Sequence, residues 1–213
     1  MAVNRLVGSD ASLYTMSFAP AITSGTLTSG LWYKIATVSG TTFPTGYEVG
    51  DLILGNGVIA ASVGSQVQLA TPTLFADVNS FELSFSKDEI EVTVLADEVK
   101  KYRSGKSDLS GTINGINFIS EMNKANSIAN RFFKIATITN VTSEVMKDIS
   151  NAALYAQFYI QDDESSGETS AFLFGEIELF GYNLGAAVSD AQSWSSSVRF
   201  TNRDPIMYFR THA

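Results

Sequence analysis

Cysteine is absent from this 213-residue chain, and histidine occurs only once. Without cysteine there can be no disulfide, no thiolate zinc site and no cysteine nucleophile, and the fold needs no oxidising compartment. A catalytic serine or a zinc centre usually recruits histidine, yet His212 lies one residue from the carboxyl end, where chain order is least expected. The sequence therefore predicts no catalytic residue, no cofactor and no metal site, and we expect that the protein is not an enzyme.

Basic residues and long apolar segments are also scarce. The chain has 14 Lys and Arg against 22 Asp and Glu, a formal net charge of -8. Proteins that grip nucleic acid replace counterions with Lys and Arg, so DNA is expected to pass without being bound specifically. Residues 1–6 are not followed by the apolar stretch of a signal peptide, and no segment approaches the roughly 20 apolar residues of a membrane span. We expect a soluble protein made in a cytoplasm.

Alternating apolar and polar residues indicate strands along much of the chain. In the best example, Ile90, Val92 and Val94 alternate with polar residues that include Glu89 and Glu91, which is typical of a strand with one buried face. Similar runs occupy residues 81–85, 172–180 and 193–201. Together with 16 glycines and only 4 prolines, this pattern predicts a mainly β (α+β) fold, an antiparallel β-sandwich.

One segment near residue 150 has a different period. Its apolar residues recur at three- and four-residue spacing, at Met146, Ile149, Ala153, Ala156 and Ile160. Ser143 stands where a helix amino-terminal cap would be. The spacing predicts one helix over about 143–160 that flanks the sandwich.

The order of turn signals predicts three parts. Residues 1–28 are small and polar, and they are expected to form an amino-terminal arm with one strand. Residues 29–72 contain short strand patterns separated by Gly- and Pro-containing turns, which predicts a small β-module. Residues 73–213 are expected to form the sandwich with its helix.

Three motifs resemble a phosphate-binding loop, a calcium loop and an acid–base pair, and each has a simpler interpretation. Residues 105–107, Gly-Lys-Ser, lack the earlier glycine of a phosphate-binding loop, since Lys100 stands at that position. The acidic run at 162–164 fails the calcium-loop spacing, because Leu173 occupies the place of the bidentate acid. Glu176 and Glu178 lie two apart on one polar strand face, where surface alternation accounts for them without acid–base chemistry.

A cluster of basic residues in this acidic chain admits two interpretations. Lys100, Lys101, Arg103 and Lys106 fall within a polar segment, 96–107, that is predicted to be a long connection between two strands. Loops of about a dozen residues are uncommon in compact domains and are often functional. Either the charges only keep a solvated loop soluble, or the loop docks on a negative surface of a neighbouring copy and sets the register of the contact.

The order of elements in residues 81–210 resembles that of the major tail tube subunits of long-tailed bacteriophages. The resemblance rests on the strands at 81–85 and 90–94, the long loop to Ser107, the strand from Asp108, the helix at 143–160 and the closing strand from Trp194 to Phe200. It implies a β-sandwich with a flanking helix whose copies form six-fold rings. The rings stack into the hollow tube through which genomic DNA leaves the virion.

The resemblance also implies partners and positions for the contacts. The arm at 1–28 and the loop at 96–108 would bridge neighbouring rings, which makes Lys100, Lys101, Arg103 and Lys106 the candidate stacking residues. Tape-measure, tail terminator and baseplate proteins would be further partners in the virion tail. Acidic side chains would line the conduit and repel DNA, and the candidates from the polar strand faces are Glu89, Glu91, Glu176 and Glu178.

The module at 29–72 departs from the simplest members of that family. It is either a decoration on the tube exterior or a sign that the chain is a related tail or head-completion protein. The alternative function is therefore a virion decoration or adaptor protein, or another head–tail binding module, which would remain a discrete oligomer at all concentrations.

Overall fold

The structure is a computed structural model. It describes residues 4–8, 11–39, 43–44, 46–91, 100, 102–118, 127–140, 143–148, 151–161, 169–185, 191–201 and 205–211.

Strands make up nearly all the regular structure of these residues, and the helical part is a single 3-10 turn, η1 (Ile128–Arg131). The strands are β1 (Asn4–Gly8), β2 (Ala11–Ile22), β3 (Gly25–Thr26), β4 (Trp32–Ile35), β5 (Leu52–Leu54), β6 (Ala60–Ala61), β7 (Val67–Val78), β8 (Ser80–Glu91), β9 (Tyr102–Phe118), β10 (Ile135–Asn140), β11 (Ser143–Lys147), β12 (Leu154–Gln161), β13 (Thr169–Leu184), β14 (Ala191–Phe200) and β15 (Ile206–Thr211). The predicted mainly β, antiparallel fold is confirmed.

The chain divides into two compact units, and the boundaries differ from those predicted. The first unit contains residues 1–14 and 74–213, and the second contains residues 15–73. The predicted module at 29–72 lies inside the second unit, but residues 1–28 are not one separate arm. Their first strand, β1, pairs with β8, and their second, β2, contributes to both units.

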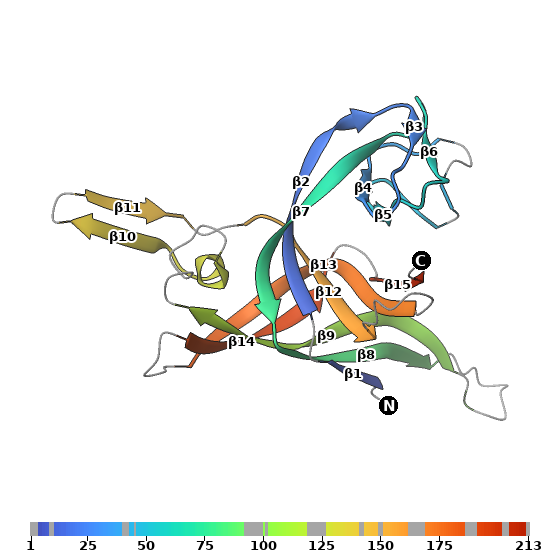
Figure 1. Cartoon of the computed structure of the whole chain (residues 1–213). Coiled ribbons are helices and arrows are strands. Elements are labelled where there is room, and N and C mark those ends of the chain that lie inside the picture. The colour runs from blue at the N-terminus through green and yellow to red at the C-terminus, as the bar shows by residue number, and fades with distance from the viewer. Residues whose placement is uncertain are drawn as a thin grey trace. The chain divides into compact units, whose positions relative to one another are not determined.

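The first unit is built on one continuous sheet in the order β1-β8-β9-β14-β13-β12-β2-β7, with β15 also paired to β13 (Figure 1). The sheet curves, because β1 approaches β12 although four strands lie between them in this order. Across the core, the rings of Phe81 on β8 and Phe158 on β12 lie 4.9 Å apart. The two walls of the predicted sandwich are therefore parts of one curved sheet.

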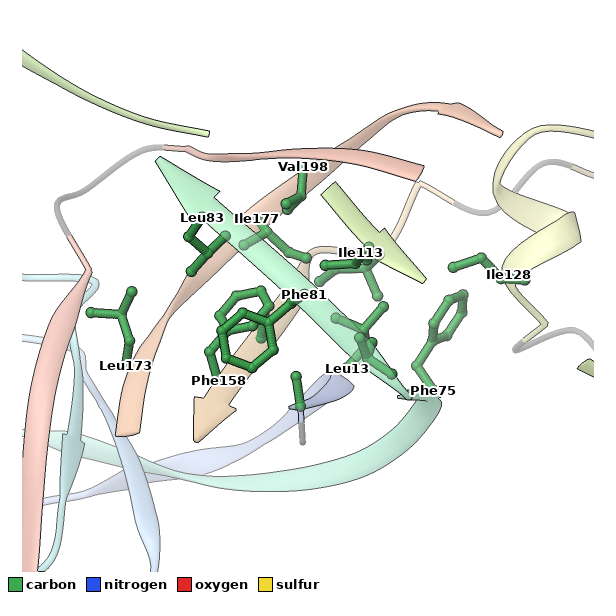
Figure 2. Packing of buried hydrophobic residues seen from close by; sticks show 14 of the residues in the cluster. Leu13, Phe75, Phe81, Leu83, Ile113, Ile128, Phe158, Leu173, Ile177 and Val198 are labelled. Atoms are coloured by element: carbon green, nitrogen blue, oxygen red, sulfur yellow. The ribbon is translucent and has the colours of Figure 1, made fainter. Parts of the chain in front are cut away.

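Alternation explains which side chains fill the interior of this unit. On β14, Trp194, Ser196 and Val198 are buried and the residues between them are not, as the sequence pattern predicted. Figure 2 shows Phe81 and Phe158 side by side among aliphatic side chains from several strands. Burial of apolar area contributes roughly 25 cal/mol per Å², so this cluster is the main source of the unit's stability.

The helix predicted over 143–160 is wrong. Residues 143–147 form β11 and residues 154–161 form β12. Every second residue from Leu154 to Phe158 is fully buried, whereas Ala153 and Ile160, which belong to the predicted helix face, are exposed. The apparent three- and four-residue spacing arose because the chain leaves one strand, runs through residues 151–153 without regular structure and enters another.

The second unit has its own small core. Strand β4 pairs with β5 and with β7, and β3 pairs with β6. The buried side chains of this core are Leu27, Tyr33, Ile35, Phe43, Ile53, Ala61 and Val67. A tight turn at residues 55–57 begins with Asn56, whose side-chain oxygen accepts hydrogen bonds from the backbone of Val58 and Ile59 at 2.9 and 3.0 Å.

Candidate assembly surfaces

Residues 102–107 of the predicted long connection at 96–107 are part of strand β9, and they belong to a projecting ribbon. β1 pairs with β8 only at residues 81–85, and β14 pairs with β9 only from Ser110 onward. Beyond those points β8 and β9 pair only with each other, from Ser86 opposite Asp108 to Glu91 opposite Tyr102. We call this part, residues 86–91 with 102–108, the β8–β9 ribbon (Figure 1). Residues 92–99 and Lys101 lie outside the described residues.

Two of the candidate stacking residues, Arg103 and Lys106, belong to this ribbon, and Lys100 contacts it through Glu91. Arg103 is exposed on β9 opposite Ile90, and the exposed Lys100 side chain is 3.3 Å from the carboxylate of Glu91. Lys106 is in β9, but its side chain lies outside the described residues. The sequence did not indicate that a candidate lumen acid, Glu91, would pair with a candidate stacking base. Because both partners are largely exposed, the pair contributes little stability.

The four candidate lumen acids do not form one surface. Glu91 is on the ribbon, and Glu89 occupies β8 opposite Ser104 with its side chain outside the described residues. Glu176 and Glu178 are on β13, which is separated from β8 by β9 and β14 in the sheet. The register places Glu176 opposite Tyr155 and Glu178 opposite Arg199.

A surface that the sequence reasoning missed is the outer face of β8, β9 and β14, which we call the polar sheet face. The register aligns Glu82 with Thr112 and then Ser197, and Ser80 with Asn114 and then Ser195. Its residues, all exposed or half-buried, are Ser80, Glu82, Ser84, Ser110, Thr112, Asn114, Ile116, Ser193, Ser195, Ser197 and Arg199. Most carry short uncharged side chains. The alternation of β14 contains a signal for this face, because every second residue from Ser193 to Arg199 is polar.

A cleft of about 360 Å³ opens in the first unit where β12 and β13 separate. It is lined by Arg131 at the end of η1, by residues 151–153 and by residues 176–179 of β13, so both Glu176 and Glu178 border it. The Arg131 guanidinium lies 5.4 Å from the centre of the Phe75 ring and donates a hydrogen bond to the Ala152 carbonyl. These contacts hold a cation beside two carboxylates.

The charges of the cleft affect one another. Burial lowers the pKa of Arg131 below its usual value, and the negative charge of Glu178 acts in the opposite direction. Arg131, Glu176 and Glu178 are the titratable side chains of the described lining. Within the described part of the chain, no group of three or more His, Asp or Glu residues could hold a metal ion.

The described residues also include no helix that is long and apolar enough to cross a membrane. Comparisons with protein-family models, curated proteins and solved structures found no match to this chain.

Proposed function

We propose that this chain is a structural subunit that assembles with copies of itself into stacked rings, as the major tail tube subunits of long-tailed bacteriophages do. DNA would pass through the resulting conduit, and the protein would belong to a virion tail. The observation that carries the proposal is the polar sheet face, a broad surface of serine, threonine and asparagine that has one arginine and no lysine.

Such a face suits a channel wall for DNA. Binding to nucleic acid depends on cations that neutralise phosphates, and on aromatic side chains that stack on bases. The polar sheet face has almost none of either, while Glu82 adds a negative charge. In this proposal Glu82 replaces Glu89 and Glu91 as a lumen acid, since those two residues lie on the β8–β9 ribbon.

The β8–β9 ribbon is suited to contact the next ring. It extends past the part of the sheet that pairs with β1 and β14, it carries the exposed Arg103, and the exposed Lys100 contacts its Glu91. Charge complementarity across such a contact sets its register and its rate of formation more than its strength. A contact between two different surfaces of the same chain propagates into rings or stacks.

The test is electron microscopy of the purified protein over a concentration series, together with a charge-reversal variant. Lys100→Glu, Lys101→Glu and Arg103→Glu combined should prevent stacking and leave the circular dichroism spectrum and melting temperature of the subunit unchanged. Arg103→Glu and Lys87→Glu form a matched pair, because each reverses one exposed charge. Arg103→Glu should weaken stacking more, because Arg103 lies farther along the ribbon from the rest of the sheet than Lys87 does. Stacks formed by the triple variant as readily as by the parent would contradict the electrostatic part of the proposal.

The alternative, a decoration or adaptor protein, is favoured by one feature. The second unit is a compact module with highly exposed apolar side chains, Val58 and Val63, each 80% exposed. Closed particles of fixed size at every concentration would support this alternative and exclude a tube subunit.

A further inference from the structure

Two apolar side chains of β15 belong to the interior face of the curved sheet and yet are exposed. The register places Met207 opposite Leu173, a buried residue of the core. Phe209 follows two residues later and therefore lies on the same face. Met207 and Phe209 are nevertheless 45% and 71% exposed. We call these two side chains the ribbon-end patch, because β15 lies at the end of the sheet from which the β8–β9 ribbon projects (Figure 1).

β15 holds this patch in a fixed position. Tyr208 stands between the two patch residues and belongs to the other face of the sheet. Its ring centre lies 5.4 Å from that of Phe172 and 6.5 Å from that of Phe174, and both phenylalanines are buried. The strand is thus anchored by aromatic contacts, so little conformational freedom remains to be lost when the patch meets a partner.

The opposite end of the same strands also exposes apolar side chains. Ile116 on β9 and Leu184 on β13 lie on either side of the first residues of β14, and they are 50% and 44% exposed. Phe133 contacts Tyr182 of β13 edge-on, with 6.1 Å between ring centres, and is still 55% exposed. We call Ile116, Phe133 and Leu184 the far-end patch.

We propose that the ribbon-end patch of one copy docks on the far-end patch of a copy in the next ring. The inference rests on the self-assembly proposed above and names the contact between rings. Because the two patches lie at opposite ends of the same strands, each copy can contact one neighbour with each end, and such a head-to-tail contact propagates into a stack. The β8–β9 ribbon projects past the same end as Met207 and Phe209, so it would flank the contact with its exposed Arg103.

The area of the patches favours a ring of copies over a single copy as the partner. A fully buried aromatic side chain contributes roughly 150–250 Å², so at their observed exposure the patch residues offer only about 200–300 Å² on each side. A stable interface needs about 800 Å² per partner. One such contact is too small for a stable dimer, whereas several contacts made together between two rings reinforce one another. We therefore expect assembly to begin steeply above a threshold concentration.

The absence of cysteine makes a direct test possible. One preparation carries Met207→Cys and another carries Leu184→Cys. The two are mixed under assembling conditions and treated with a short bis-maleimide. We expect a covalent dimer from the mixture and little from either preparation alone. Exchanging Leu184→Cys for Val63→Cys, an exposed apolar position in the second unit, should abolish the product. A cross-link formed by Met207→Cys alone would indicate a symmetric dimer and overturn the head-to-tail contact.

A second variant tests the same contact without a cross-linker. Phe209→Ser should raise the concentration needed for assembly, measured by sedimentation, by at least about tenfold. Val63→Ser also removes an exposed apolar side chain and should leave that concentration unchanged. Both variants should melt like the parent, and the cross-link decides if Phe209→Ser does not. If the parent assembles and neither the cross-link nor the effect of Phe209→Ser is found, the contact between the patches is wrong and self-assembly stands. If the parent remains monomeric at high concentration, both proposals fail.

Discussion

The packing of Trp194 against Gly115 allows a quantitative prediction for the core of the first unit. Trp194 is 2% exposed, and it faces Gly115 across the β9–β14 ladder. A methyl group placed on Gly115 would lie 2.5 Å from two carbon atoms of the indole ring and 2.6 Å from its nitrogen. Carbon atoms normally approach to roughly 3.5–4.0 Å, so Gly115→Ala requires the ring or the strand to move by about 1 Å.

The free energy of unfolding should decrease in this variant. Overpacking a core typically costs about 1–3 kcal/mol, and replacing a strand glycine by alanine recovers roughly 0.5–1 kcal/mol. The net expectation is a loss of about 1–2 kcal/mol, which lowers the melting temperature by roughly 2–4 °C per kcal/mol for a domain of this size.

Trp194 can report this change by itself. The only other tryptophan, Trp32, lies in the second unit, so a Trp32→Phe background leaves one fluorophore in the first unit. Urea unfolding is followed by fluorescence for the parent background and Gly115→Ala, and by circular dichroism for all four proteins, including Trp194→Phe and the double variant. The smaller phenyl ring leaves room for the methyl group, so the double variant should be at least about 0.5 kcal/mol more stable than additivity predicts. Additive effects, or a stabilising Gly115→Ala, would refute the described packing.

Two further predictions concern pH and the channel wall. Burial, helped by the charge of Glu176, raises the pKa of Tyr155 to about 12 from an ordinary value of 10. Between pH 10 and pH 12 the unfolded chain releases the Tyr155 proton that the native state keeps, so the free energy of unfolding should fall by about 3 kcal/mol. In denaturant unfolding, the free energy of unfolding of Tyr155→Phe should fall less over this pH range. An equal fall in the variant would contradict a raised pKa of Tyr155. Assemblies of Ser197→Lys should retain DNA at low salt and release it as the salt concentration rises. Assemblies of Val58→Lys, a control in the second unit, should not retain DNA. Equal retention by both variants would refute the proposal that the polar sheet face lines the channel.

Strands with one buried face could be predicted from the sequence because their alternation is local. The runs around residues 81–85, 172–180 and 193–201 fall within β8, β13 and β14 as expected. The helix at 143–160 failed because two short strands joined by an irregular segment can imitate a helical spacing. The lengths of the two segments distinguish them from a helix, because β11 and β12 have 5 and 8 residues and an average helix is longer.

The candidate surfaces were harder to predict because they depend on pairing between distant segments. Nothing local in residues 4–8 indicates that β1 lies beside β8. Likewise, Lys100 and Glu91 are nine residues apart and were predicted to have separate roles, and only the structure shows that their side chains lie 3.3 Å apart. The polar sheet face exists only because three strands align in one register, so its serines could not be recognised as a surface one strand at a time.

The topology also explains how the second unit can be present without interrupting the sheet of the first. The chain enters the second unit along β2 and leaves it along β7, and these two strands are hydrogen-bonded neighbours. Ser17 on β2 donates a hydrogen bond to the carbonyl of Thr71 on β7 at 3.5 Å. The segment 15–73 is thus an insertion between two paired strands, a place where added residues carry only a modest entropic cost. The β8–β9 ribbon and the polar sheet face both belong to the first unit. The features that support self-assembly therefore do not include residues of the inserted module. The module can provide a separate binding surface.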